Sequence, residues 1–461
     1  MDSNMKVDTV ILAAGEGTRM VSERPKVLHT ILGKPMIGYV LDAVSPFSGR
    51  RLVVVGKGAH EVRRQLEGKV LFIEQPERRG TGDAVRYALP QVEAPFTLVV
   101  PGDMPLVSQE SLGRLFEAMR GGEAAMALLT TVVENPHGYG RIVREGDSVA
   151  AIVEEAEASE EIKAIREINL GIYLFETDFL KEAVEQISPS AVKGEYYLTD
   201  TVAIARQMGR RVVAERALHP WEGQGINNRV DLAKAEELMR SRVLENLMLR
   251  GVTIVMPKTV YVEPQVEVGA DTTIHPGAFL EGKTKVGRNC TIGMGVHLKD
   301  TVVGDGAKVL DYSVLEESVV ESNAQVGPFA RIRPGTVIGE KAKVGNFVEM
   351  KKTRFGKGAK ASHLSYVGDA VVGEDVNIGA GTITCNYDGF SKHQTVIEKG
   401  AFIGSDTQLV APVKVGENAL VGAGSTITKN VPANSLALTR APQRVREGKG
   451  MLFQARRRGK K

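Results

Sequence analysis

Hydrophobic positions in the first half of the chain alternate between short continuous runs and stretches with helical spacing. The runs that predict buried strands cover residues 7–14, 51–56, 70–75 and 96–103. The stretches that predict helices cover residues 37–44, 81–89 and 110–120. Strands that alternate with helices predict an α/β fold, with a largely parallel sheet covered by helices on both faces.

The second half, from about residue 251, has a different period. An aliphatic residue recurs every six positions, with slips in register. The repeated positions are Val268, Ile274, Leu280, Val286, Ile292 and Leu298, then Val303, Val326, Ile332, Ile338 and Val344, then Val372 and Ile378, and then Ile403, Leu409, Val415, Val421 and Ile427. A period of six fits neither a helix nor a single strand, but it fits a coil with three short faces and one inward residue per face. We therefore expect a parallel β-helix of hexapeptide repeats.

Two stretches interrupt the repeat, residues 351–371 and 384–402. We expect them to project from the wall of the β-helix as loops, where chemistry is often located. Between the two halves, residues 231–250 have the pattern of a helix that ends before Gly251. The predicted organisation is an α/β domain over residues 1–229, a helical linker over 230–250, and a β-helix with a C-terminal tail over 251–461.

Composition narrows the class of protein. The 461 residues are 43% hydrophobic and 25% charged, with a net charge of +3. These values are typical of a globular protein and give no basic field that would indicate nucleic-acid binding. No apolar run reaches the length of about 18 residues that a membrane helix needs, and no signal-peptide pattern precedes the first strand. With only two cysteines, Cys290 and Cys385, we expect a cytoplasmic protein without a membrane partner.

The first candidate site is the segment "VILAAGEGTRM", residues 10–20. It lacks the lysine of a Walker A loop, and Met20 stands where a dinucleotide-binding fingerprint needs glycine. The glycines still allow the backbone to approach a triphosphate closely, while Arg19 and Lys26 supply positive charge. A strand-to-helix turn with surface charges is the alternative.

A second candidate is Asp103, the last residue of the predicted strand run at 96–103. The carboxyl ends of parallel strands line the ligand crevice of an open α/β sheet. A carboxylate beside a triphosphate is a natural ligand for Mg²⁺, although an aspartate at this place can also cap the next helix.

Several motifs together resemble sugar-1-phosphate nucleotidyltransferases: "LAAGEGTRM", "RPKVLH", "EQPERRGTGDA", "PGDMPL", "NPHGYGRIV", "IVEE", "EINLGIY" and "GINNR". Together with the hexapeptide half, the chain is similar over nearly its whole length to the family of bifunctional bacterial enzymes that make UDP-N-acetylglucosamine. This resemblance implies a Rossmann-like nucleotidyltransferase domain followed by a left-handed parallel β-helix.

The resemblance also implies roles for residues of the first half. UTP would be bound by Leu12, Ala13, Ala14 and Gly15, with Lys26 on the phosphates and with Gln75, Gly80 and Thr81 around the uracil. The sugar phosphate would meet Gly140, Glu154 and Asn169, and Mg²⁺ would be held by Asp103 and Asn227. The sugar phosphate would attack the α-phosphorus of UTP in line, and Arg19 would stabilise the departing pyrophosphate. Glu16 departs from the pattern, because a lysine is common at its position.

In the second half the informative residue is His363. A histidine suits the proton transfer that acetyl transfer to an amine requires, and cations such as Arg333 and Lys351 suit an anionic substrate. A lone loop histidine is more often a bystander, but the neighbouring sequences "ASHLSYVGDA" and "GAGTITCNYDG" resemble the acetyltransferase half of the family. Cys385 is better interpreted as a small buried filler than as a nucleophile.

The resemblance makes His363 the general base and implies two further groups of contacts. Glucosamine-1-phosphate would be bound by Arg333, Lys351, Tyr366 and Asn377. Acetyl-CoA would be bound by Ala380, Asn386, Tyr387, Ser405, Ala423 and Arg440. Sites of this kind lie between neighbouring β-helices, so the resemblance implies a homotrimer.

The resemblance predicts acetyl transfer from acetyl-CoA to glucosamine-1-phosphate, then uridylyl transfer from UTP, which gives a precursor of peptidoglycan and lipopolysaccharide. One alternative is a single-activity sugar-1-phosphate nucleotidyltransferase whose β-helix serves assembly or regulation; His363 and its cationic neighbours disfavour it. Another is a regulatory subunit like those of the eukaryotic initiation-factor exchange complex, which the intact Arg19, Lys26 and Asp103 disfavour.

Overall fold

The computed structural model describes residues 5–57, 59–120 and 124–458. The chain divides into two compact units, Met1–Met239 and Arg240–Lys461, called here the N-terminal and C-terminal units. The boundary falls within the helix α8 (Arg229–Leu249).

The N-terminal unit is built on a nine-stranded sheet with the path β11-β7-β10-β6-β1-β4-β5. Its strands are β1 (Val7–Ala13), β4 (Arg50–Gly56), β5 (Leu71–Gln75), β6 (Phe96–Pro101), β7 (Ala124–Val132), β10 (Glu167–Glu176), β11 (Arg211–Arg216) and the hairpin β8 (Arg141–Glu145) and β9 (Ser148–Val153). A short separate pair is formed by β2 (Thr30–Ile31) and β3 (Lys34–Pro35). Strands β6, β1, β4 and β5 are parallel, as the sequence predicts. However, β10 is antiparallel to both β6 and β7. The sheet is therefore mixed.

Helices cover both faces of this sheet. They are α1 (Met36–Val44), α2 (His60–Leu66), α3 (Thr81–Ala88), α4 (Gln109–Arg120), α5 (Glu160–Lys163), α6 (Thr177–Gln186) and α7 (Thr201–Gln207). The single-turn helices are η1 (Thr18–Met20), η2 (Lys26–Leu28), η3 (Leu89–Gln91), η4 (Leu198–Asp200) and η5 (Pro220–Gly223). The side chains of Val10 and Ile11 in β1 point to opposite faces, since strand side chains alternate. Ile11 packs with residues of α1, α2 and α4. Val10 packs with residues of α3, α6 and α7.

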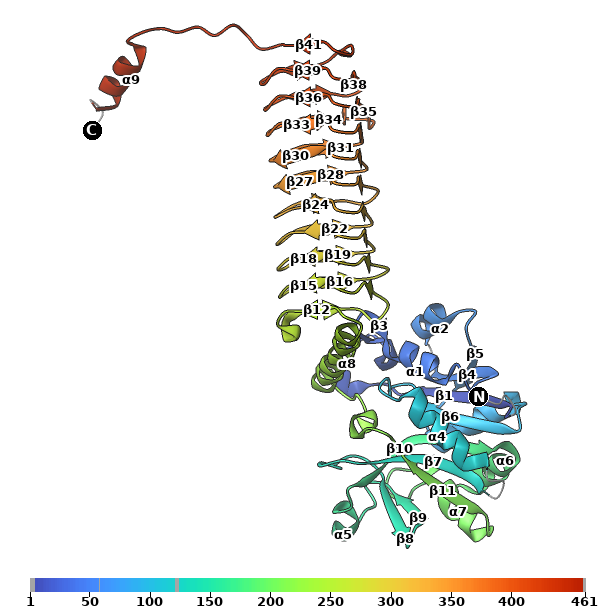
Figure 1. Cartoon of the computed structure of the whole chain (residues 1–461). Coiled ribbons are helices and arrows are strands. Elements are labelled where there is room, and N and C mark those ends of the chain that lie inside the picture. Colours follow the sequence, from blue (N-terminus) through green and yellow to red (C-terminus); the bar gives the residue numbers. More distant parts are fainter. Residues whose placement is uncertain (1–4, 58, 121–123, 459–461) are drawn as a thin grey trace. The chain divides into compact units, whose positions relative to one another are not determined.

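The C-terminal unit is a left-handed parallel β-helix whose coils form three ladders of short parallel strands (Figure 1). The first ladder contains β12 (Thr253–Ile254), β15 (Thr273–Ile274), β18 (Thr291–Ile292), β21 (Lys308–Val309), β24 (Gln325–Val326), β27 (Lys343–Asn346), β30 (Lys360–His363), β33 (Asn377–Ile378), β36 (Phe402–Ile403), β39 (Leu420–Val421) and β41 (Leu436–Ala437). The second contains β13 (Tyr261–Val262), β16 (Phe279–Glu281), β19 (His297–Lys299), β22 (Val314–Glu316), β25 (Arg331–Ile332), β28 (Glu349–Lys351), β31 (Tyr366–Gly368), β34 (Ile383–Cys385), β37 (Gln408–Val410) and β40 (Thr426–Ile427). The third contains β14 (Glu267–Val268), β17 (Lys285–Val286), β20 (Val302–Val303), β23 (Val319–Val320), β26 (Val337–Ile338), β29 (Arg354–Phe355), β32 (Ala370–Val372), β35 (Thr395–Ile397) and β38 (Val413–Val415).

The predicted interruptions of the repeat are largely wrong. Residues 351–371 remain in the wall, because β28 to β32 continue all three ladders. Their inward positions are the buried side chains Met350, Phe355, Ala361 and Val367. These positions are five or six residues apart, and the small Ala361 hides the pattern. In the second stretch, strands end at Cys385 and resume at Thr395, so only residues 386–394 form an inserted loop.

The two ends of the C-terminal unit differ. Leu244 and Leu247 of α8 join the hydrophobic core at the first coils, beside the single-turn helix η6 (Pro257–Thr259). Beyond β41 the chain continues to α9 (Lys449–Arg458), which buries none of its side chains and ends in three arginines. Of the predicted tail, residues 459–461 lie outside the described residues. Where the structure describes the chain, no helix is both long and apolar enough to cross a membrane.

Candidate active sites

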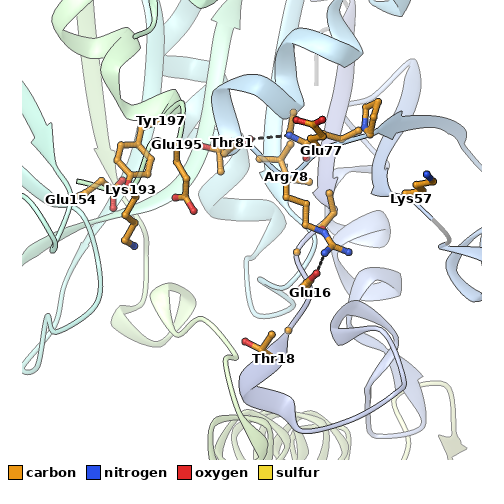
Figure 2. A pocket seen from close by; sticks show the side chains of 18 residues that line it. Glu16, Thr18, Lys57, Glu77, Arg78, Thr81, Glu154, Lys193, Glu195 and Tyr197 are labelled. Carbon is orange, nitrogen blue, oxygen red and sulfur yellow. Dashed lines mark hydrogen bonds and ion pairs between the residues drawn. The ribbon is translucent and has the colours of Figure 1, made fainter. Parts of the chain in front are cut away.

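A cavity of about 1120 Å³ opens at the carboxyl ends of β1 and β5. This edge of a parallel sheet is where ligands bind in open α/β folds. Several residues predicted to bind UTP or the sugar phosphate line it: Leu12, Ala14, Gly15, Gln75, Gly80, Thr81 and Glu154. Figure 2 shows Tyr197 beside Glu154, with Thr81 between this pair and Glu77 in the view. Ala13 differs, because its side chain lies in the core cluster beneath the loop.

The wall around the predicted uracil position needs a glycine. Gly80 has φ +107°, and a Cβ atom there would lie 2.4 Å from the carbonyl oxygen of Tyr196. The side chain of Gln75 is buried and donates to Asp83 Oδ2 at 2.8 Å. Asp83 was not among the predicted residues, although it lies within the "GTGDA" motif, and it fixes the orientation of the Gln75 amide.

Four predicted residues from different segments meet at one point. The Nζ atom of Lys26 lies 2.5 Å from Asp103 Oδ2 and 3.1 Å from Asn227 Oδ1. Arg19 Nη2 donates to the same Asn227 oxygen at 2.9 Å. Two oxygens from segments far apart in the sequence thus converge on one cationic group. A carboxylate and an amide oxygen are also donors that Mg²⁺ accepts.

Residues 5–57, 59–120 and 124–458 contain no group of three or more His, Cys, Asp or Glu side chains that could hold a metal ion. Mg²⁺ commonly binds one or two protein oxygens and takes its other ligands from substrate phosphates and water. The pair Asp103 and Asn227 fits this way of binding, with two protein oxygens and the remaining ligands from phosphate and water.

The three residues predicted to meet the sugar phosphate also lie together. The backbone N–H of Asn169 donates to Gly140 O at 2.9 Å. A Cβ atom on Gly140 would lie 3.4 Å from Glu154 Oε1, so this position places the strand close to the carboxylate. Thr199 Oγ1 donates to Glu154 at 3.3 Å. Burial raises the pKa of Glu154 above its ordinary value, and the Thr199 hydrogen bond opposes this only in part.

Arg78 supplies a cation that sequence reasoning missed. Its Nε atom donates to Ala14 O at 2.7 Å, and its guanidinium forms an ion pair with Glu16 (Figure 2). Both side chains line the cavity. Arg78, on the segment that follows β5, therefore offsets the negative charge that Glu16 brings to the glycine loop.

In the C-terminal unit, His363 is the last residue of β30 rather than part of a loop. It pairs in register with Asn346 on the preceding coil, and its Nδ1 atom lies 2.9 Å from Asn346 Oδ1. Asn346 was not among the predicted residues, and outward polar side chains carry no periodic signal by which to find it.

Four residues predicted to bind acetyl-CoA continue the same column on successive coils. Asp406 N donates to Ala380 O at 2.7 Å, and Gly424 N donates to Ser405 O at 2.8 Å. Arg440 Nη1 donates to Ala423 O at 2.8 Å. The column therefore runs through Asn346, His363, Ala380, Ser405, Ala423 and Arg440.

Around the corner from His363, the second ladder carries the predicted phosphate ligands. Arg333 N donates to Met350 O, which places Arg333 beside Lys351 on the next coil. Arg333 Nη1 lies 2.9 Å from Glu349 Oε1, and Glu349 is in register with Tyr366.

Asp369 connects this region to the inserted loop. It lies 4.0 Å from Lys351 Nζ and accepts a hydrogen bond from Asn386 Nδ2 at 2.5 Å. Tyr387, the next loop residue, has Lys392 Nζ 4.2 Å from its ring centre. Burial raises the pKa of the Cys385 thiol, which disfavours a thiolate nucleophile.

One predicted residue lies apart from the others. Asn377 belongs to the first ladder, in register with Lys360 and Phe402, whereas Lys351 and Tyr366 belong to the second. A single chain does not place Asn377 with the other predicted glucosamine-phosphate ligands.

Comparisons with known proteins follow the same division of the chain. Residues 9–167 match the family model of the MobA-like NTP transferase domain. Residues 256–354 match the GMPPB C-terminal domain, and residues 394–429 match the bacterial transferase hexapeptide (six repeats). A crystal structure of a putative glucose-1-phosphate thymidylyltransferase from Bacillus anthracis is 21% identical, with a TM-score of 0.42, and covers 51% of this chain and 95% of its own.

Curated relatives match almost end to end. The bifunctional protein GlmU of Heliobacterium modesticaldum is 49% identical over 96% of this chain and 97% of its own. The bifunctional protein GlmU of Syntrophotalea carbinolica is 52% identical over 95% of both chains. That of a Thermotoga species (strain RQ2) is 48% identical over 95% of this chain and 97% of its own. Identity of this degree over the full length shows that the chain belongs to the family of bifunctional GlmU proteins.

Proposed function

We propose that this chain makes UDP-N-acetylglucosamine in two steps. The C-terminal unit transfers an acetyl group from acetyl-CoA to glucosamine-1-phosphate. The N-terminal unit then transfers a uridylyl group from UTP to N-acetylglucosamine-1-phosphate and releases pyrophosphate. The observation that carries the proposal is the presence of two separate polar clusters, one around Lys26 and Asp103 and one around His363. The single-activity and regulatory alternatives give no role to the His363 column.

For uridylyl transfer, the cavity beside β1 and β5 holds UTP, with the glycine loop on its phosphates and Gln75 and Gly80 at the uracil. Gly140, Glu154 and Asn169 orient the sugar phosphate so that one of its oxygens attacks the α-phosphorus in line. Lys26 and Arg19 offset the charge that develops on the phosphates and on the leaving pyrophosphate. Asp103 and Asn227 would hold Mg²⁺, which supplies further neutralisation of phosphate charge when bound.

For acetyl transfer, the side-chain oxygen of Asn346 accepts the Nδ1–H of His363, which leaves the lone pair on Nε2. His363 Nε2 takes a proton from the amino group of the sugar as the amine attacks the thioester carbonyl, and coenzyme A leaves as the thiolate. Arg333, Lys351 and Tyr366 orient the sugar phosphate. The column from Ala380 to Arg440, with Asn386 and Tyr387 of the inserted loop, receives acetyl-CoA.

We further propose that the C-terminal unit forms a homotrimer whose acetyl-transfer sites are shared between chains. Tyr312, Phe329 and Phe347 stack along one corner of the β-helix, with 5.4 Å between successive ring centres, and all three are about half exposed. Each has a positive φ, which is costly for an aromatic residue. Such an exposed apolar column supports an interface. The separation of Asn377 from Lys351 supports completion of the site by a neighbouring chain.

The proposed substrates also suit a cytoplasmic enzyme, because UTP and acetyl-CoA are intracellular metabolites and the free thiols Cys290 and Cys385 suit a reducing compartment.

Two variants of the full chain test the division of labour. Asp103→Ala is expected to abolish pyrophosphate release and to leave acetyl transfer near its normal rate, while His363→Ala is expected to do the reverse. Free thiol is followed with glucosamine-1-phosphate and acetyl-CoA. Pyrophosphate is followed in a separate mixture of N-acetylglucosamine-1-phosphate, UTP and Mg²⁺, so that neither readout depends on the other step. If either variant lost both activities while still folded, the two-site proposal would be wrong.

A further inference from the structure

Glu222 is a charged residue that neither the motifs nor the proposed chemistry uses. It belongs to η5, and its side chain is fully buried. Its carboxylate accepts hydrogen bonds from Ser108 N at 2.9 Å and from Ser108 Oγ at 3.0 Å. It also accepts from Ser111 Oγ at 2.9 Å and from His219 N at 3.3 Å. A buried carboxylate is costly unless donors surround it in this way, so the arrangement requires these donors in fixed places.

Three of these four donors come from Ser108 and Ser111, on the segment that carries Asp103 and on the helix α4 that follows it. That segment leaves β6, is anchored at its start by the 2.8 Å hydrogen bond from Gly102 N to Leu12 O, and ends at Ser108. The Oγ atom of Ser108 also accepts from Ser111 N at 3.1 Å, in the first turn of α4. Glu222 therefore fixes the far end of the Asp103 segment.

The acceptor lies on the segment that carries Asn227. After η5, Gly225 N donates to Tyr139 Oη at 3.2 Å, and Asn227 N donates to Asp231 Oδ2 at 3.1 Å. The Asn227 segment is thus fixed at η5 by Glu222 and at the start of α8 by Asp231. One buried carboxylate joins the two segments whose side-chain oxygens converge on Lys26.

We propose that Glu222 is the positioning residue that sets the separation of Asp103 and Asn227 for Mg²⁺. This inference rests on the proposed uridylyl transfer and deepens it. The carboxylate can accept from all its donors at once, whereas a glutamine of the same shape would present an NH₂ group toward one of them. Glu222→Gln would therefore shift one segment against the other without removing any group that touches substrate.

The test compares Glu222→Gln with Asp8→Asn in the full chain. Asp8 is also a buried carboxylate that accepts from backbone N–H groups, those of Glu93 and Ala94, but it lies at the amino end of β1. Binding of Mn²⁺ in the presence of UTP is measured from the signal of free Mn²⁺ in electron paramagnetic resonance. The half-saturating Mg²⁺ concentration for pyrophosphate release is measured in parallel.

We expect Glu222→Gln to weaken Mn²⁺ binding and to raise the half-saturating Mg²⁺ concentration by about tenfold, as changes in groups that orient metal ligands typically do. Acetyl transfer should stay normal. Asp8→Asn should lower the unfolding temperature without changing metal binding. If Glu222→Gln does not fold, Ser111→Ala, which removes one donor, should weaken Mn²⁺ binding in the same direction but less.

The inference would be overturned if Glu222→Gln bound Mn²⁺ as tightly as the control Asp8→Asn does. Where Ser111→Ala replaces Glu222→Gln, equal binding by Ser111→Ala and Asp8→Asn would overturn it in the same way. Either result would leave the proposed function intact. A wild-type chain that releases no pyrophosphate in the presence of Mg²⁺ is a different result, since it would overturn the proposed function and this inference with it.

Discussion

The Nδ1 atom of His363 lies 2.9 Å from the side-chain oxygen of Asn346, which occupies the same place on the preceding coil. The rigid ladder thus holds the histidine and its hydrogen-bond partner in register. Asn346 selects the form of the ring that carries its proton on Nδ1 and leaves Nε2 able to accept one.

Replacement of Asn346 tests this role. Asn346→Ala is expected to lower kcat for acetyl transfer by about tenfold, less than the 10²–10⁴-fold loss that follows removal of a general base. The KM for glucosamine-1-phosphate should change little, because Asn346 acts through His363. Steady-state kinetics of thiol release measure both constants, with uridylyl transfer as the internal control. A large rise in KM with normal kcat would instead make Asn346 a substrate ligand.

Arg19 is expected to act on the leaving group. Its hydrogen bond to Asn227 places it beside the Lys26 cluster. Arg19→Ala should lower kcat for uridylyl transfer by about 10²-fold, as loss of one transition-state donor does, with a smaller effect on UTP affinity. Arg24→Ala is the matched control, since Arg24 is exposed and lines a different cavity. Equal losses in kcat and in UTP affinity would show that Arg19 only binds the ground state.

Glu154 couples stability to pH. Burial raises the pKa of Glu154 in the folded state, so ionisation of this carboxyl group opposes folding. The loss of stability is absent below the pKa of the unfolded chain, and it develops as the pH rises through the pKa of the folded chain. Glu154→Gln should therefore raise the unfolding temperature of the N-terminal unit at pH 7.5, by about 2–4 °C per kcal/mol. The difference should disappear near pH 4. Calorimetry at both pH values measures it, and a destabilised variant at pH 7.5 would contradict the prediction.

The exposed aromatic column offers a test of the trimer. Phe347→Glu places a charge at one end of the three stacked rings and is expected to yield monomers by light scattering. Acetyl transfer should fall steeply, while uridylyl transfer should stay near normal. Val302→Glu is the control, because Val302 is an exposed apolar residue of the third ladder. A monomeric variant with full acetyl transfer would refute shared sites.

The sequence predicts the scaffold better than the contacts within the sites. Inward residues such as Ile292 and Leu409 repeat because a narrow core admits only certain side chains, so their period is visible in one sequence. The coil that contains Ala361 was predicted as an interruption of the repeat, because a small inward residue carries little hydrophobic signal. The strand β10 was not among the predicted strands, and its antiparallel direction could not be predicted because the direction of a strand depends on its connections.

Contacts between distant segments explain the other omissions. Arg78 meets Glu16, and Glu222 meets Ser108, only after the sheet has formed. The residues of each pair are far apart in the sequence, so no local spacing predicts the contact. By contrast, Lys26 and Asp103 could be proposed from the sequence, because each follows a recognisable strand or loop motif.

The two ends of the β-helix have unequal protection against unravelling. Leu244 and Leu247 close the first coils, whereas the last strand, β41, is a two-residue edge that pairs with β39. In a linear array each coil is stabilised by its neighbours, so opening begins at the less protected end. Ala423 and Arg440 lie at this C-terminal end of the β-helix. Acetyl-CoA bound along their column would therefore stabilise the last coils against opening. Slower hydrogen exchange in those coils would report binding of acetyl-CoA directly, without any turnover.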